Sequence, residues 1–228
     1  MDAEPDIASV AQLLADGARA AMVGVLTDGS ARPASELAAV AGVSKSTASA
    51  HLGKLLEYDL VAVEPHGRHR YFRLGGAEVA AAIEALAVVA RPRPVRSPQA
   101  GRAADALRAA RTCYDHLAGG LGVALADALV ETHILRPSGG EYELGPRGRE
   151  SLAGLGVDPD ELTRRRRAFA RPCLDWSERR HHVGGALGAA LAERFFELGW
   201  LERAGPARGV RVTPSGRRGF RGAFGLDV

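Results

Sequence analysis

The sequence of 228 residues contains no long apolar run. No stretch of about 18 apolar residues occurs, so a membrane-spanning helix is not expected. The N-terminus is acidic, with Asp2, Glu4 and Asp6, and lacks the basic-then-apolar start of a secretory signal peptide. We therefore expect a cytoplasmic protein without a membrane partner.

Two residue types are scarce. The chain has only 2 cysteines, which argues against a disulfide scaffold and for a reducing compartment. Lysine occurs only at Lys45 and Lys54, although the chain is rich in arginine. This bias indicates a GC-rich genome more than a mechanism.

The usual motifs of enzymes are absent as well. The sequence has no glycine-rich phosphate loop, no Gly-x-Ser-x-Gly elbow and no His-Glu-x-x-His helix. We therefore expect a protein that is not an enzyme. The remaining catalytic alternative is an enzyme in which Cys113 or Cys173 acts as the nucleophile.

The most informative pattern lies in residues 31–74. Residues 34–41 predict a short amphipathic helix that Gly42 ends in a tight turn. Ser44 is placed to cap a second helix over 45–57, whose apolar residues recur at helical spacing. The small polar residues on its first two turns suit a close approach to bases and phosphates in a major groove. The residues predicted to contact DNA here are Ser44, Lys45, Ser46, Thr47 and Ser49.

A basic hairpin is expected directly after this helix pair. Two strand-like runs, 60–64 and 69–74, are joined at 65–67, and the second alternates basic and apolar residues. Arg68 and Arg70 are therefore predicted to contact the DNA backbone or minor groove. Helix, turn, second helix and basic hairpin in this order predict a winged helix-turn-helix. The alternative is a protein-interaction module whose polar residues are merely solvated.

The runs 43–52 (VSKSTASAHL) and 67–74 (GRHRYFRL) resemble the ArsR/SmtB family of bacterial transcriptional regulators. The resemblance covers roughly residues 5–90, under half of the chain. It implies that the polar start of the second helix faces DNA and that Arg68 and Arg70 lie on the wing. His51 occupies the family's usual histidine position and is counted among the predicted DNA-binding residues, because a helix-packing histidine near the backbone phosphates is favoured there over a metal ligand.

Two further apolar stripes flank this unit, in residues 7–14 and 76–90. A single winged helix cannot bury both well. In the resembling family the first and fifth helices form the dimer interface, so the resemblance implies a homodimer on an imperfectly palindromic double-stranded operator. The family's metal sites would require cysteine or histidine in 35–39 or 78–84, and neither segment has one.

The predicted domain organisation follows composition. Residues 91–100 are rich in proline and arginine and predict an extended linker between domains 1–90 and 101–228. Residues 1–90 carry 7 basic and 11 acidic residues, whereas 91–228 carry 23 and 16. The positive charge of the first domain is thus confined to the second helix and the wing, so DNA affinity should depend on local contacts.

The second half contains an internal similarity. Residues 116–127 match 182–193, residues 111–115 match 171–175, and 142–148 match 210–216. Three matched blocks in one order predict a duplicated unit, with repeats of about 111–158 and 171–227, related by a pseudo-twofold axis. Each repeat should contain a cysteine segment, a Gly/Ala-rich helix, a β-hairpin and a short helix. The expected fold class is therefore mostly α with small β-hairpins (α+β).

The repeated cysteines and histidines suggest a metal site. Cys113 and His116 would share one face if they lay on a helix, and pseudo-symmetry would bring them to Cys173 and His182. These four residues form a Cys₂His₂ set suited to Zn²⁺ or a softer ion. Thiol-based redox sensing and simple structural roles remain alternatives, because cysteine is also a common small core residue. The sequence 175–178 is a capping box and predicts the start of a helix.

An organic effector is the other option for this half, because most of the few aromatic residues lie there. The predicted pocket residues are Tyr114, Trp176, Phe195, Phe196 and Trp200. The leading function is thus a dimeric DNA-binding regulator, expected to be a repressor, controlled through its C-terminal domain by a small molecule or metal. The alternative is a metal or thiol sensor that uses Cys113, His116, Cys173 and His182. The less favoured third option is an enzyme with an attached DNA-binding domain.

Overall fold

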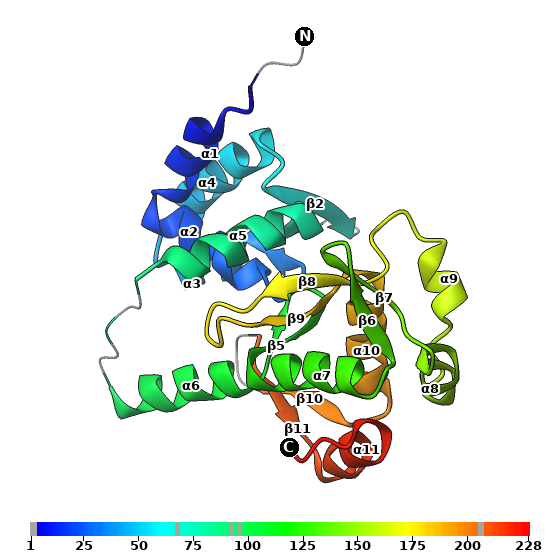
Figure 1. Ribbon diagram of the computed structural model, residues 1–228. Coiled ribbons are helices and arrows are strands. Elements are labelled where there is room, and N and C mark those ends of the chain that lie inside the picture. Colours follow the sequence, from blue (N-terminus) through cyan, green and yellow to red (C-terminus); the bar gives the residue numbers. More distant parts are fainter. Residues whose placement is uncertain (1–3, 67–68, 92–93, 95–96, 205–207) are drawn as a thin grey trace. The chain divides into compact units, whose positions relative to one another are not determined.

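The computed structural model describes residues 4–66, 69–91, 94, 97–204 and 208–228 (Figure 1). The chain divides into two compact units, the first reaching Ile83 and the second beginning at Glu84. The division falls inside a helix, upstream of the predicted linker 91–100. Helices and short antiparallel hairpins account for most of the described chain, which confirms the predicted α+β class.

The first unit consists of helices around a small antiparallel sheet with strand order β1-β3-β2. Its elements are α1 (Ile7–Leu14), α2 (Gly17–Leu26), β1 (Arg32–Pro33), α3 (Ala34–Ala41), α4 (Lys45–Glu57), β2 (Val61–His66) and β3 (His69–Leu74). Helix α5 (Ala77–Val89) follows, and the division between the units falls after its residue Ile83. The predicted helix pair and hairpin are confirmed. The first strand of the hairpin, β2, extends to His66 and not to residue 64 as expected. Residues 67 and 68 lie outside the described ranges, so the prediction for Arg68 has no structural counterpart.

The turn between α3 and α4 depends on two residues. Gly42 has a φ of 66°, a left-handed conformation that glycine adopts without strain. Ser44 then caps α4, and its side chain accepts a hydrogen bond from the backbone N–H of Thr47. Leu37 of α3 and Leu52 and Leu55 of α4 are almost wholly buried. Burial of each such side chain contributes about 1.5–3 kcal/mol, so the core fixes how the two helices cross.

A buried carboxylate closes the loop before α3. Asp28 is 5% exposed and accepts hydrogen bonds from the backbone N–H and hydroxyl of Ser30 and from Arg32 at 2.6 Å. Arg32 also pairs with Glu36 of α3. Burial would raise the pKa of Asp28, but the bonds from Ser30 and Arg32 outweigh it and lower the pKa below its usual value.

Among the residues that the structure describes, the second unit contains four two-stranded hairpins and several helices. Its elements are α6 (Pro98–Ala109), β4 (Arg111–Cys113), β5 (His116–Ala118), α7 (Gly119–Glu131), β6 (Leu135–Ser138), β7 (Glu141–Leu144), α8 (Gly148–Gly154), α9 (Pro159–Thr163), β8 (Arg171–Leu174), β9 (His181–Gly184), α10 (Gly185–Glu197), β10 (Leu201–Arg203), β11 (Val210–Val212) and α11 (Pro214–Phe224). Ser97 caps α6 and Pro98 occupies its first turn, so the end of the expected extended linker is helical.

The order of elements in the second unit repeats. Hairpin β4–β5, helix α7, hairpin β6–β7 and helix α8 are followed, after α9, by hairpin β8–β9, helix α10, hairpin β10–β11 and helix α11 (Figure 1). The hairpins expected near 133–144 and 200–212 are present. The duplication itself stays a prediction.

The glycines of α7 and α10 allow close approaches to strands. A Cβ at Gly122 would lie 2.6 Å from the carbonyl oxygen of Leu117, and one at Gly188 would lie 2.2 Å from that of Val183. We expected the two helices to pack on one another, but α7 packs against β9 and α10 against β5. Gly122 and Gly188 thus allow each helix to approach the strand that precedes it, whereas each helix as a whole packs on the strand of the other segment.

Within the described ranges, no single helix is long and apolar enough to cross a membrane. Helices α1 and α2 satisfy those criteria only as a pair, which is bent by 94°.

Candidate functional site

The start of helix α4 is a polar, exposed surface. Lys45, Ser46, Thr47 and Ser49 are exposed, whereas Ala48 is fully buried. The helix thus contacts the core through one side and leaves the predicted DNA-contacting residues facing outward. This distribution is what a helix that enters a major groove requires.

The hydroxyl groups at this helix start form one network. The Oγ of Ser44 lies 2.9 Å from that of Ser46 and 2.8 Å from Oγ1 of Thr47. Backbone N–H groups and the positive end of the helix dipole meet at the same place. The arrangement is suited to phosphate oxygens and to base edges.

His51 has a packing contact. Its Nδ1 lies 3.3 Å from Nη1 of Arg19, a buried residue of α2. Arg19 also donates hydrogen bonds to the carbonyl oxygens of Leu13 and Gln12. His51 therefore helps attach α4 to α1 and α2, and its contact with DNA stays a prediction.

The wing hairpin presents one exposed basic residue among those predicted. Arg70 on β3 is exposed, and its guanidinium lies 5.7 Å from the ring centre of Phe72. Arg73 instead forms an ion pair with Glu64 of β2, with Nε and Oε1 at 2.6 Å. Arg70 is thus the described wing cation best placed for DNA.

The second unit brings together the four residues predicted as metal ligands. The expectation that Cys113 and His116 share a helix face is wrong, because they lie opposite one another on hairpin β4–β5. Cys173 and His182 are opposite one another on hairpin β8–β9. Directly opposed residues in an antiparallel pair project from the same face, so each hairpin presents one thiol and one imidazole together.

These two pairs meet in a compact cluster. The two sulfur atoms are 3.9 Å apart, the two Nε2 atoms are 3.1 Å apart, and all four candidate ligand atoms lie within 4.8 Å of one another. Cys113, His116 and His182 are buried, and Cys173 is half-buried. We name these four residues the Cys/His cluster.

A carboxylate faces the outer nitrogen of each imidazole. Nδ1 of His116 is hydrogen-bonded to Asp115 at 3.1 Å, and Arg167 pairs with that carboxylate at 2.6 Å. Nδ1 of His182 lies 3.3 Å from Asp175, in an ion-pair contact that lacks hydrogen-bond geometry. Both Nε2 atoms are thereby left facing the centre of the cluster.

Asp175 is the most heavily contacted of these groups. It is fully buried, and both oxygens accept hydrogen bonds from Arg111 at 2.9 Å. It also accepts bonds from the N–H of Gly119 and from Ser177. Burial would raise the pKa of Asp175, but His182, Arg111 and these bonds outweigh it and hold the pKa far below its usual range.

The predicted helix at 175–178 is wrong. Asp175 does accept bonds from the N–H groups of Ser177 and Glu178, as a cap would, but the chain forms a turn between β8 and β9. An Asx-type turn uses the same side-chain bonds as a helix cap, so this pattern does not separate the two.

The sulfur atoms also affect one another. The hydrogen bond between them raises the pKa of Cys113, and burial raises it further. The same bond lowers the pKa of Cys173, and hydrogen bonds with His116 and His182 lower it against the effect of burial. The pKa of His182 is raised, because contacts with Asp175 and Cys173 outweigh the effect of its burial.

Comparisons with known proteins identify a helix-turn-helix domain in the first unit. A family model described as a helix-turn-helix domain matches residues 14–64. The HTH-type transcriptional regulator YdfF of Bacillus subtilis (strain 168), described as uncharacterized, is 44% identical over 224 residues, which cover 98% of this chain and 99% of that protein. The chain belongs to the HTH-type transcriptional regulators.

Two of the solved structures that resemble this regulator match about two fifths of its chain. The homodimeric winged helix-turn-helix DNA-binding domain of Mb0332 from Mycobacterium bovis is 29% identical, covering 39% of this chain and 89% of its own, with a TM-score of 0.34. The cadmium sensor CmtR of Mycobacterium tuberculosis is 30% identical, covering 40% and 95%, with a TM-score of 0.33. The family assignment rests on the full-length relative.

The aromatic residues predicted to form an effector pocket lie in different environments of the regulator. Phe195 and Trp200 stack at 5.4 Å within the core. Phe196 contacts Arg203, and Trp176 lies under Arg111 with its ring centre 4.5 Å away. Tyr114 occupies the turn of hairpin β4–β5 with a φ of 59°.

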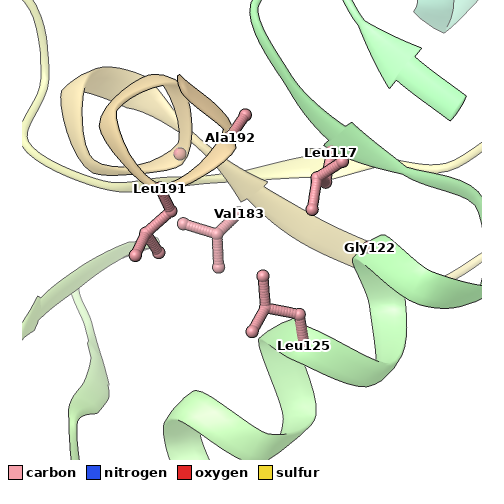
Figure 2. Close-up of a pocket in the computed structure, with 7 residues that line it drawn as sticks. Leu117, Gly122, Leu125, Val183, Leu191 and Ala192 are labelled. Carbon is pink, nitrogen blue, oxygen red and sulfur yellow. The ribbon is translucent and has the colours of Figure 1, made fainter. Parts of the chain in front are cut away.

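A small cavity lies elsewhere in the second unit. It measures about 10 Å³ and is lined by Leu117, Gly122, Leu125, Val183, Gly188, Leu191 and Ala192. Figure 2 shows Val183 of β9 between Leu125 of α7 and Leu191 of α10. This volume is at the limit for one water molecule and the walls are apolar, so the cavity cannot hold an organic effector.

The sequence does not predict Arg111 as the partner of Asp175, because 64 positions separate the two residues. It does contain a signal for the two carboxylates that face the histidines. Asp115 and Asp175 occupy the same place in the matched segments 111–115 and 171–175, each two residues after a cysteine. A repeated aspartate beside a repeated Cys/His pair indicates carboxylates that orient the imidazoles.

Proposed function

We propose that this regulator is a homodimeric repressor in the cytoplasm that binds an imperfectly palindromic operator and is controlled through its second unit. The observation that carries DNA binding is the exposed polar start of α4, on a helix whose other side is buried through Ala48, Leu52 and Leu55. A reading helix needs this combination of a fixed position and free base-contacting residues.

The first turns of α4 would enter the major groove. Lys45 can donate to a guanine edge or a phosphate, and the hydroxyls of Ser46 and Ser49 suit either base edges or backbone oxygens. Arg70 on the wing would contact the backbone. Because residues 1–90 carry more acidic than basic residues, this affinity would depend on few local contacts and fall with salt.

A second copy of the chain is the proposed partner for the exposed apolar residues of α1 and α5. Ile7 on α1 is 75% exposed, and Leu86 and Val89 on α5 are 51% and 78% exposed. Leu86 and Val89 lie three positions apart and therefore share one side of α5, and neighbouring exposed apolar side chains of this kind can form an interaction surface. The resemblance to the ArsR/SmtB family supports the same two helices as a dimer interface.

The Cys/His cluster supports control through the second unit. It is the one group of at least three potential metal ligands in close contact among the described residues. A metal or thiol sensor is therefore the second candidate function. Operator affinity measured with and without bound zinc tests it, because a sensor requires the two values to differ.

The two lysines of the chain give a matched test of DNA binding. Both are exposed on α4, but they lie nine positions apart, which places them on opposite sides of the helix. Lys45→Ala should weaken binding to the duplex upstream of the protein's own gene, and Lys54→Ala should not. Electrophoretic shift against a scrambled duplex of equal composition measures both, and equal effects of the two substitutions would contradict the proposed face.

A further inference from the structure

The Cys/His cluster has the geometry of a metal centre. We propose that Cys113, His116, Cys173 and His182 bind one Zn²⁺ in a closed tetrahedral site that joins hairpins β4–β5 and β8–β9. Each hairpin supplies one thiolate and one imidazole, so the ion would connect two segments about sixty residues apart in sequence. The inference does not depend on DNA binding.

The distances agree with tetrahedral coordination. Zn–S bonds of about 2.3 Å and Zn–N bonds of about 2.05 Å at the tetrahedral angle place two sulfurs about 3.8 Å apart and two nitrogens about 3.3 Å apart. The cluster has 3.9 Å between the sulfurs and 3.1 Å between the Nε2 atoms. Both pairs are therefore close to the separations that one ion would impose.

The positions of the protons on the two imidazoles also favour a cation at the centre of the Cys/His cluster. Asp115 and Asp175 face the Nδ1 atoms, and a carboxylate at that position favours a proton on Nδ1. Both Nε2 atoms then carry lone pairs, and they face each other at 3.1 Å. Two lone pairs at this distance repel unless a proton or a metal ion lies between them.

The surroundings are those of a ligated metal. Each carboxylate is itself held by an arginine, Asp115 by Arg167 and Asp175 by Arg111. Such carboxylates fix the tautomer and orientation of metal-bound histidines. A Zn²⁺ ion with two thiolates and two neutral imidazoles carries no net charge, so its burial avoids the cost of an unpaired charge.

Room for the imidazoles comes from the glycines of the opposite helices. A Cβ at Gly188 of α10 would lie 3.1 Å from the Cβ of His116, and one at Gly122 of α7 would lie 3.4 Å from the Cβ of His182. A Cβ at Gly184 would lie 3.3 Å from Nε2 of His116. Glycines thus lie against both histidines, and the closest approach is that of Gly188 to His116.

The site would be closed to reaction chemistry. Four protein ligands complete a tetrahedral shell, and no position remains for water or substrate. We therefore expect an ion that stabilises the second unit when it is bound and that takes no part in a reaction. A disulfide is the competing product of two sulfurs this close, but it would require them to approach from 3.9 Å to about 2.05 Å and would leave the facing histidines unexplained.

The first experiment measures metal content and ligand type. The full chain is purified under reducing conditions, stripped with a chelator and reloaded with Zn²⁺ or Co²⁺. We expect one zinc per chain by mass spectrometry. The Co²⁺ form should show the visible absorption of a tetrahedral site and a thiolate charge-transfer band. Failure to reload one equivalent, or a Co²⁺ form without the thiolate band, would overturn the proposal.

Variants then assign the ligands. His182→Gln and Cys113→Ser should lose stoichiometric zinc, whereas His181→Gln, a change at the exposed neighbour on the same strand, should retain it. If a ligand variant does not fold, Asp115→Asn keeps all four ligands and should weaken zinc binding about 10- to 100-fold. Unchanged zinc affinity in Asp115→Asn, full zinc in Cys113→Ser, or a native disulfide without zinc would each refute the site.

Discussion

Replacing Thr47 by glutamate should move protein stability and DNA affinity in opposite directions. Thr47 is exposed in the first turn of α4, and its N–H is already bound by Ser44. A glutamate there faces the positive end of the helix and completes a Ser-x-x-Glu capping box. The same negative charge would stand where the proposed complex brings a DNA phosphate or base edge.

The two effects have different expected sizes. An acidic side chain in the first turn contributes about 0.3–1 kcal/mol to helix stability. For a unit of about 80 residues, 1 kcal/mol raises Tm by roughly 4–8 °C. Against DNA, a charge about 4 Å from a phosphate costs about 1 kcal/mol in water and about 4 kcal/mol at an effective dielectric of 20. At about 1.4 kcal/mol per factor of ten, affinity should fall about 5-fold to about 1,000-fold.

Calorimetry measures the stability, and fluorescence anisotropy with the labelled upstream duplex measures the DNA affinity. Both use the same preparations at one salt concentration. Thr163→Glu, the same substitution at an exposed position of the second unit, is the control and should leave the affinity unchanged. If the Thr47→Glu protein binds DNA as tightly as the wild type, the start of α4 does not enter the groove. Loss of binding together with a lower Tm would contradict the capping argument.

Four further changes test other parts of the molecule. Arg70→Ala should lower the slope of log K against log salt by about one, because one phosphate contact is lost. Leu86→Glu combined with Val89→Glu should give monomers in analytical ultracentrifugation, because both exposed side chains are assigned to the dimer interface. Asp175→Asn should lower the free energy of unfolding in urea by about 3–5 kcal/mol, because it leaves a buried guanidinium unpaired. Asp28→Asn should destabilise the protein at pH 7, and the difference should vanish as the pH falls below about 4 through the lowered pKa of this carboxyl.

Matched substitutions separate these effects from general damage. Arg136→Ala, at an exposed arginine of the second unit, should leave the salt slope unchanged, and Val40→Glu should leave the oligomeric state unchanged. Asp227→Asn breaks an exposed ion pair and should cost less than about 1 kcal/mol. A monomeric Val40→Glu variant, or equal costs at Asp227 and Asp175, would show that the assigned contacts are not the cause.

The helix-turn-helix was predictable from local signals. Gly42 at the turn and Ser44 at the cap act within a few residues, and the apolar spacing of α4 repeats over thirteen residues. Such signals are independent of distant contacts, so the structure agrees closely with the expected helices. The contact of His51 with Arg19 was harder to predict from the sequence, because it depends on how α2 crosses α4.

The Cys/His cluster was predictable in membership but not in geometry. The repeated residues named all four side chains, but Cys113 and His116 were expected three positions apart on a helix. Strands of three residues are too short for a period to show, and Tyr114 turns the chain through a left-handed conformation that its residue type does not indicate. The ion pair of Arg111 with Asp175 could not be predicted, because only the packed unit brings the two together.

Selection of binding sites from a random double-stranded DNA library tests the central claim most directly. The full-length protein, at physiological salt, is used to enrich bound duplexes, which are then sequenced. A dimer that places two copies of α4 in successive major grooves predicts an imperfect palindrome with half-site centres about 10–10.5 base pairs apart. The Lys45→Ala variant should fail to enrich it. Enrichment of no motif, or the same motif from Lys45→Ala and wild-type protein, would contradict DNA reading by α4.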